Sequence, residues 1–157
     1  MSNCCELVQA RVQEGDLKIV LAGNPNVGKS VVFHGLTGVY VEVSNFPGTT
    51  VDISSGRFGE KAVVFDTPGV YGVSAFNDEE RVARDVILSA DTVVNVVDAA
   101  HLDRDLFLTL QIIDMGYPVV VALNMMDEAE ANGLAIDVKK LAEDLGVEVV
   151  PMVAVKK

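Results

Sequence analysis

The chain has 157 residues, 50% of them hydrophobic, which is enough for one domain with a sizeable buried core. Its formal net charge is −11, from 12 Lys and Arg against 23 Asp and Glu, and this balance disfavours nucleic acid as a partner. No apolar run approaches the roughly 20 residues of a transmembrane helix, and the N-terminus lacks the pattern of a secretory signal.

Apolar, β-branched runs alternate with segments of helical spacing along the chain. Six runs are predicted as strands: residues 17–22, 54–58, 61–65, 92–97, 117–123 and 147–150. Three segments are predicted as helices: residues 31–37, 102–115 and 138–145. Gly59 and Glu60 suggest a hairpin between the second and third strands. We therefore expect an α/β fold with a mainly parallel six-stranded sheet and helices on both faces, and a closing helix after residue 157.

Residues 1–16 form a short lead, and residues 17–157 form the expected domain. Cys4 and Cys5 in the lead are adjacent, which excludes an ordinary disulfide framework. We interpret both as reduced cysteines in a frayed terminus, with metal binding or lipid attachment as the alternatives.

The first motif lies between the first strand and the first helix. It fits G-x-x-x-x-G-K-[ST] and consists of Gly23, Asn24, Pro25, Asn26, Val27, Gly28, Lys29 and Ser30, with Val31 continuing the predicted nucleotide-binding segment. The glycines let backbone N–H groups form a concave nest, to which the following helix adds its positive end. Lys29 should reach the β- and γ-phosphates, and the Ser30 hydroxyl should bind Mg²⁺. The alternative is a chance glycine turn with a surface lysine.

The second motif, Asp66-Thr67-Pro68-Gly69, follows the strand at residues 61–65. A carboxylate at this place can hold Mg²⁺ through water, and the Gly69 N–H can face a γ-phosphate. Such a sequence is a common turn on its own. Its position after a buried strand, downstream of the first motif, makes it a partner of the phosphate loop.

The third motif, Asn124-Met125-Met126-Asp127, follows the strand at residues 117–123. The Asp127 carboxylate can accept hydrogen bonds from N1–H and the exocyclic amine of guanine, a pattern that adenine does not offer. Asn124 would brace this loop against the phosphate loop. A helix-capping turn is the alternative for this motif taken alone. The three motifs together indicate GTP.

A fourth segment, at residues 44–50, lies between the first helix and the hairpin. Its hydroxyls belong to Thr49 and Thr50, which follow Gly48, and one of them should complete the Mg²⁺ coordination. A segment of this kind becomes ordered with GTP and is released after hydrolysis.

These residues resemble the cytosolic G domain of the ferrous iron transport protein B (FeoB) family, P-loop GTPases of the potassium-activated type with a Ras-like fold. The resemblance runs from about Lys18 to Pro151. It is carried by residues 23–30, 45–51, 66–71 with 78–84, and 97–99, and residues 106–116 also fit. The element Asn45-Phe46-Pro47-Gly48-Thr49-Thr50-Val51 discriminates best, because it separates this family from other P-loop GTPases.

The resemblance implies particular roles for single residues. Thr50, rather than Thr49, would be the Mg²⁺ ligand of the switch segment, alongside Ser30 and Asp66. Asn26 would help to hold K⁺ against the phosphates, where the cation neutralises charge that other families meet with an arginine finger. A turn residue that satisfies nearby backbone groups is the alternative for Asn26. Lys29, Thr50 and Gly69 would carry hydrolysis.

The resemblance also implies a biological setting. The chain would bind GTP and GDP as the regulatory domain of a prokaryotic Fe²⁺ transporter, at the cytoplasmic face of the inner membrane. Its partners would be the transporter's own helical and transmembrane domains, and a homo-oligomer. A ribosome-assembly or tRNA-modification GTPase is one alternative, and a nucleotide-sensing module with incidental hydrolysis is another.

Two positions depart from the pattern of related GTPases. Val70 stands where Ras-type enzymes place a water-orienting glutamine, so intrinsic hydrolysis should be slow. The last guanine-contacting loop, assigned to Val153, Ala154 and Val155, lacks its usual serine and would contact the base through backbone N–H groups.

Overall fold

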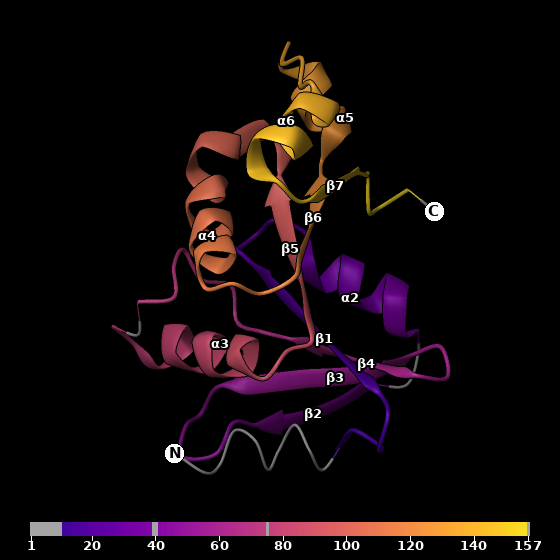
Figure 1. The fold of residues 1–157 in the computed structure, drawn as a ribbon, viewed down its shortest axis with the longest axis vertical. Helices are drawn as coiled ribbons and strands as arrows, with labels where there is room; N and C mark the ends of the chain where they lie inside the picture. The colour runs from indigo at the N-terminus through magenta and orange to yellow at the C-terminus, as the bar shows by residue number, and fades with distance from the viewer. Residues whose placement is uncertain (1–10, 39–40, 75, 157) are drawn as a thin grey trace.

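A single mixed sheet organises the protein. The computed structural model describes residues 11–38, 41–74 and 76–156, so Cys4 and Cys5 lie outside the described residues. Within them, seven strands follow the order β2-β3-β4-β1-β5-β6-β7 (Figure 1). Their bounds are Leu17–Gly23 (β1), Val41–Asn45 (β2), Asp52–Phe58 (β3), Ala62–Asp66 (β4), Thr92–Asp98 (β5), Val119–Asn124 (β6) and Glu148–Pro151 (β7). Five of these strands are parallel, whereas β2 and β3 run antiparallel to their neighbours.

Helices cover both faces of the sheet, as expected. They are Lys29–Thr37 (α2), Asp78–Leu88 (α3), Leu102–Asp114 (α4), Met126–Ala131 (α5) and Val138–Leu145 (α6), with a 3₁₀ turn, Ala99–His101 (η1), before α4. Helix α2 packs Phe33 into one core cluster, and α3 and α4 pack Ile87 and Leu108 into the cluster on the other side (Figure 1). No described helix combines the length and apolar character that a membrane crossing needs.

The expectation of six strands is wrong, because β2 adds a seventh at the edge of the sheet. It pairs antiparallel with β3, with Ser44 opposite Ile53. Its outward position explains why sequence patterns miss it. Val43 is 60% exposed, so the strand lacks the buried apolar side chains that identify the others. What defines β2 is backbone pairing with β3, which local sequence does not encode.

Local sequence explains the composition of the central strands and the residues at which helices α3 and α6 begin or end. Strands β5 and β6 are nearly continuous runs of valine because helices cover the central sheet on both sides. Helix α3 begins at an Asn77 cap whose side chain accepts from the Glu80 N–H at 2.8 Å. The first turn of α3 is acidic, and carboxylates at this end of a helix interact favourably with its dipole. Gly146, with φ 70°, ends α6 in the left-handed region.

Candidate functional site

The phosphate-loop motif forms a concave turn between β1 and α2. Two of its residues, Asn26 and Gly28, have positive φ values of 65° and 86°. A pocket of about 320 Å³ opens over the turn. It is lined by Asn24, Pro25, Asn26, Gly28, Lys29, Ser30, Val31 and Gly69. The N-terminus of α2 and its backbone N–H groups therefore face a space of a size suited to phosphate groups.

Lys29 connects the first motif to the second. Its side chain is 10% exposed, and its Nζ lies 2.5 Å from Asp66 Oδ1, whose side chain is 15% exposed. The same ammonium also donates to the Thr67 carbonyl oxygen. Lys29 and Asp66 are 37 residues apart in the sequence. Their partly buried ion pair joins the two motifs at the carboxyl ends of β1 and β4.

The segment after Asp66 lies directly against the phosphate loop. A Cβ atom added to Gly69 would come within 2.9 Å of Pro25 Cα, so only glycine fits there without displacing the loop. The Val70 N–H donates to the Gly23 carbonyl at 3.0 Å, and the Val70 side chain is buried at 3% exposure. The Val70 side chain therefore packs in the core, and it has no polar group that could orient water.

Asn124 holds three loops together. Its Nδ2 donates to the Val27 carbonyl at 3.0 Å, and its Oδ1 accepts from the Ala154 N–H at 2.9 Å. A Cβ atom on Gly28 would lie 2.4 Å from Asn124 Nδ2, which explains glycine at this point of the loop. The cap residue of α5 is Met125, with φ 60°, and no side chain caps that helix. Asn124 is therefore a brace of the phosphate loop and does not cap a helix.

Asp127 lies in the first turn of α5, near the segment from Val153 to Val155. Its carboxylate accepts from the Glu128 N–H at 3.0 Å and lies 3.2 Å from Lys156 Nζ. The side chain is 37% exposed and so remains accessible to a ligand. The loops after β6 and β7 meet here, because Met126 N donates to Met152 O.

The two candidate threonines have different surroundings. Thr49 Oγ1 donates to the Phe46 carbonyl at 3.0 Å and accepts from the Val51 N–H at 3.1 Å, so it stabilises the turn that links β2 to β3. Thr50 is exposed. Phe46 anchors this turn in the core at 6% exposure. The hydroxyl of Thr50 is therefore the one accessible to a ligand.

One polar contact at the phosphate loop was not visible in the sequence. Asn24 is 2% exposed, and its Nδ2 donates at 2.8 Å to Oδ1 of Asp105, which is 1% exposed on α4. The two residues are 81 positions apart, and no motif connects them. Only the packing of α4 beside the end of β1 could have indicated the pair.

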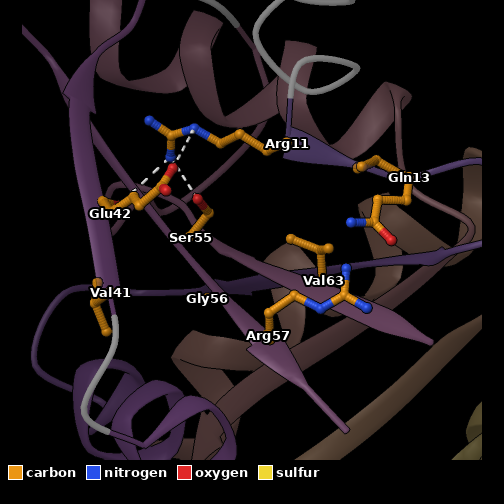
Figure 2. Close-up of a pocket in the computed structure, with 9 residues that line it drawn as sticks. Arg11, Gln13, Val41, Glu42, Ser55, Gly56, Arg57 and Val63 are labelled. Atoms are coloured by element: carbon orange, nitrogen blue, oxygen red, sulfur yellow. Dashed lines mark hydrogen bonds and ion pairs between the residues drawn. The ribbon is translucent and has the colours of Figure 1, made fainter. Parts of the chain in front are cut away.

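A second pocket, of about 420 Å³, lies away from these motifs against β2, β3 and residues 11–13 (Figure 2). Arg11 crosses it and donates to Ser44 Oγ at 2.6 Å and to Ser55 Oγ. Arg57 pairs with Asp16 at 2.6 Å. That hydrogen bond, with one from the Gln13 N–H, holds the pKa of Asp16 below its usual 3.8. This pocket is larger than the phosphate pocket, but it contains none of the predicted site residues.

The sheet order, the phosphate loop at the end of β1 and the acidic and amide motifs at the ends of β4 and β6 define the fold of a Ras-like P-loop GTPase. The family model described as "Ferrous iron transport protein B" matches residues 17–157. The chain therefore belongs to the FeoB family, and it matches the N-terminal G-domain part of that family.

Known proteins agree with this assignment. The "Fe(2+) transporter FeoB" of Legionella pneumophila (strain Lens) is 47% identical over 146 residues, which cover 87% of this chain and 19% of the relative. A point mutant of S. thermophilus NFeoB bound to GDP is 46% identical with a TM-score of 0.85, covering 90% of this chain and 57% of that one. The FeoB G-domain from Methanococcus jannaschii is 46% identical with a TM-score of 0.76, covering 90% and 88%. The chain thus spans about a fifth of its curated relatives.

Proposed function

We propose that this chain binds GTP and GDP and hydrolyses GTP as the regulatory G domain of an Fe²⁺ membrane transporter. One observation carries the proposal: Lys29, Asp66 and Asn124, from three separate motifs, converge on the loop that forms the 320 Å³ pocket. The S. thermophilus relative bound to GDP supports the ligand, because it shares 46% of its residues with this chain.

The residues around the pocket suit a nucleoside polyphosphate with Mg²⁺. Lys29 would move from Asp66 to the β- and γ-phosphates, and the backbone N–H groups of residues 26–31 would surround them. Ser30, Thr50 and Asp66 supply oxygen ligands of the kind that Mg²⁺ prefers. Bound Mg²⁺ would neutralise charge on the phosphate oxygens.

Guanine recognition would fall to the loops after β6 and β7. Asp127 would accept from N1–H and the exocyclic amine, while Asn124 keeps its loop against Val27. Met125 and the segment Val153, Ala154 and Val155 would border the base. The Ala154 N–H already donates to Asn124, so the remaining N–H groups of that segment are the ones available to the base.

Asn26 is the candidate K⁺ ligand. It is exposed, borders the phosphate pocket and has a φ of 65° in the left-handed region. The oxygen of its side-chain amide can coordinate a monovalent cation. Bound K⁺ would neutralise charge beside the transferring phosphoryl group.

Hydrolysis would depend on a small set of groups. Lys29 and Thr50 would stabilise and position the γ-phosphate, and the Gly69 N–H would face it from the Pro25 side of the loop. Because Val70 is buried and apolar, no side chain at that position can align the water, and we expect slow turnover. Thr67 and Pro68 would shape this segment without contributing chemistry.

The wider setting follows from the family. We propose that the domain acts at the cytoplasmic face of the inner membrane, joined to helical and transmembrane domains. We also propose that it forms homo-oligomers. The formal charge of −11 argues against RNA and therefore against a ribosome-assembly or tRNA-modification role. A nucleotide-sensing module with incidental hydrolysis is the second candidate, because Val70 stands where a water-orienting side chain would be.

The decisive experiment compares nucleotide affinities of the wild-type chain and Asp127→Asn. The wild type should prefer GDP to ADP by at least about a hundredfold, since adenine lacks the two donors that the Asp127 carboxylate would pair with in guanine. Xanthine has a carbonyl where guanine has its amine, so the amide introduced by Asp127→Asn should shift the preference from GDP to XDP. Asp114→Asn, an exposed change at the end of α4, is the matched control.

Equal affinity of the wild type for GDP and ADP would disprove guanine recognition. Steady-state GTP turnover in KCl and in NaCl then separates an enzyme from a sensor, because absence of hydrolysis in both salts would favour the sensor. Asn26→Ala should abolish a preference for KCl, whereas Asn132→Ala, an exposed change at the end of α5, should retain it.

A further inference from the structure

A buried carboxylate on α4 lies behind the phosphate loop and has no place in the proposed chemistry. Asp105 is 1% exposed and accepts three hydrogen bonds. Its Oδ2 accepts from the Asp98 N–H at 2.9 Å, and its Oδ1 accepts from Arg104 Nε and from Asn24 Nδ2, both at 2.8 Å. The pairing raises the pKa of Arg104. A buried charge is tolerated when its partners are this complete.

The carboxylate determines how Asn24 is oriented. An ionised Asp105 has only acceptors, so Asn24 must turn its NH₂ group toward it. The Asn24 carbonyl oxygen then points elsewhere, and this buried Oδ1 has no hydrogen-bond partner among the described residues. A buried acceptor without a partner is costly, so Asn24 would not adopt this orientation without the hydrogen bond to Asp105.

Asn24 lies in the middle of a short segment that is fixed from three sides. Gly23 fits against β5, where an added Cβ would lie 2.7 Å from the Val96 carbonyl oxygen. Pro25 packs against Gly69. Asn24 contributes the third attachment, to α4, through Asp105. Loss of that attachment would leave this segment held by the packing of Gly23 and Pro25 and by the hydrogen bond from the Val70 N–H to the Gly23 carbonyl.

We propose that Asp105 is a positioning residue of the nucleotide site, which fixes the second residue of the phosphate loop, Asn24, to helix α4. The inference rests on the proposed nucleotide binding and names a residue that none of the motifs contains. Asp105 touches no ligand itself. It keeps the loop ordered before a nucleotide arrives, so that this ordering does not have to occur on binding.

The test measures the GDP affinity and thermal stability of the 157-residue chain. Asp105→Ala should weaken GDP binding about tenfold, the size expected when about one residue must be ordered on binding. Asp105→Asn should recover most of the affinity, because one amide can still pair with the Asn24 amide. Asp103→Ala, an exposed change in the same helical turn, should bind GDP as the wild type does.

A double-mutant cycle distinguishes positioning from general destabilisation. In an Asn24→Ala background, Asp105→Ala should change GDP affinity by less than about twofold, because the partner is already absent. For GTP turnover, KM should rise more than kcat falls. If Asp105→Ala is too unstable to measure, Asp105→Ser replaces it, since a hydroxyl cannot serve three donors.

Two results would overturn the inference: wild-type affinity in a folded Asp105→Ala or Asp105→Ser chain, or an equal loss with and without Asn24. Failure of the wild-type chain to bind GDP is a different result. It would overturn the proposed function itself, whatever the variants at Asp105 do.

Discussion

Lys29 Nζ lies 2.5 Å from Asp66 Oδ1, so the cation expected to bind phosphates is held by the carboxylate expected to act on Mg²⁺. Neither group can take up its proposed role while the pair is closed. Nucleotide and Mg²⁺ would therefore act together: the phosphates attract the ammonium, and Mg²⁺ takes its place beside the carboxylate. The ion pair would thereby link the binding of the two ligands energetically.

Asp66→Asn tests this linkage. The neutral amide holds Lys29 less tightly, so GDP affinity without Mg²⁺ should rise several-fold, consistent with a partly buried ion pair of about 1 kcal/mol. The effect of Mg²⁺ on GTP affinity should disappear in the same variant. Lys29→Ala should weaken GDP binding about a hundredfold or more, since charge-assisted hydrogen bonds to phosphates are lost. Lys61→Ala, an exposed lysine before β4, is the control. Unchanged Mg²⁺ dependence in Asp66→Asn would contradict the linkage.

The neighbouring threonines should separate into a structural and a functional residue. Thr50→Ala should lower GTP turnover at least about tenfold and leave GDP affinity almost unchanged, because its exposed hydroxyl would act only when a γ-phosphate is present. Thr49→Ala loses the two hydrogen bonds of the turn and should lower the free energy of unfolding by about 1 kcal/mol. Turnover and chemical denaturation measure the two effects. A larger loss of turnover in Thr49→Ala would reverse the assignment.

Much of the arrangement of the candidate site was predictable, because its residues occupy fixed places relative to strands. Asp66 and Asn124 end the buried strands β4 and β6, Lys29 lies in the loop and helix after β1, and parallel strands bring their carboxyl ends to one edge. Strand β2 was not predictable, since its side chains are largely exposed and its pairing with β3 is tertiary. Asp105 was missed for a similar reason: in sequence it is one of two acidic residues in a helix start, and only burial against Asn24 distinguishes it from Asp103.

Two glycines near α2 should respond to alanine in opposite ways. Gly28→Ala places a Cβ 2.4 Å from Asn124 Nδ2 at a φ of 86°, and the backbone strain alone costs about 1–3 kcal/mol. We expect lower thermal stability and at least about tenfold weaker GDP binding. Gly35→Ala meets open space inside the same helix and should raise stability by up to about 1 kcal/mol. Wild-type GDP affinity in Gly28→Ala would show that Asn124 can move without disturbing the loop.

The last prediction concerns Arg11, which lies outside the segment that the family model matches. Its guanidinium joins the edge strand to its neighbour, because it donates to Ser44 on β2 and to Ser55 on β3, the second contact being visible in Figure 2. The turn that carries Thr50 connects those two strands. Arg11→Ala should lower the free energy of unfolding by about 1–2 kcal/mol, the usual size for lost hydrogen bonds to a charged group. Amide hydrogen exchange should accelerate in residues 41–45 more than in β6, because an edge strand opens locally when its attachment is removed.

Arg81→Ala is the matched control for this change. Arg81 belongs to an exposed ion pair with Asp78 on α3, and such pairs contribute less than about 1 kcal/mol. GDP affinity should stay within about twofold in both variants, because neither arginine lines the phosphate pocket. Unaltered exchange in residues 41–45 of Arg11→Ala would mean that backbone pairing with β3 alone holds the edge strand. Faster exchange confined to β2 would show that a residue outside the segment matched by the family model stabilises the strand leading into the switch segment.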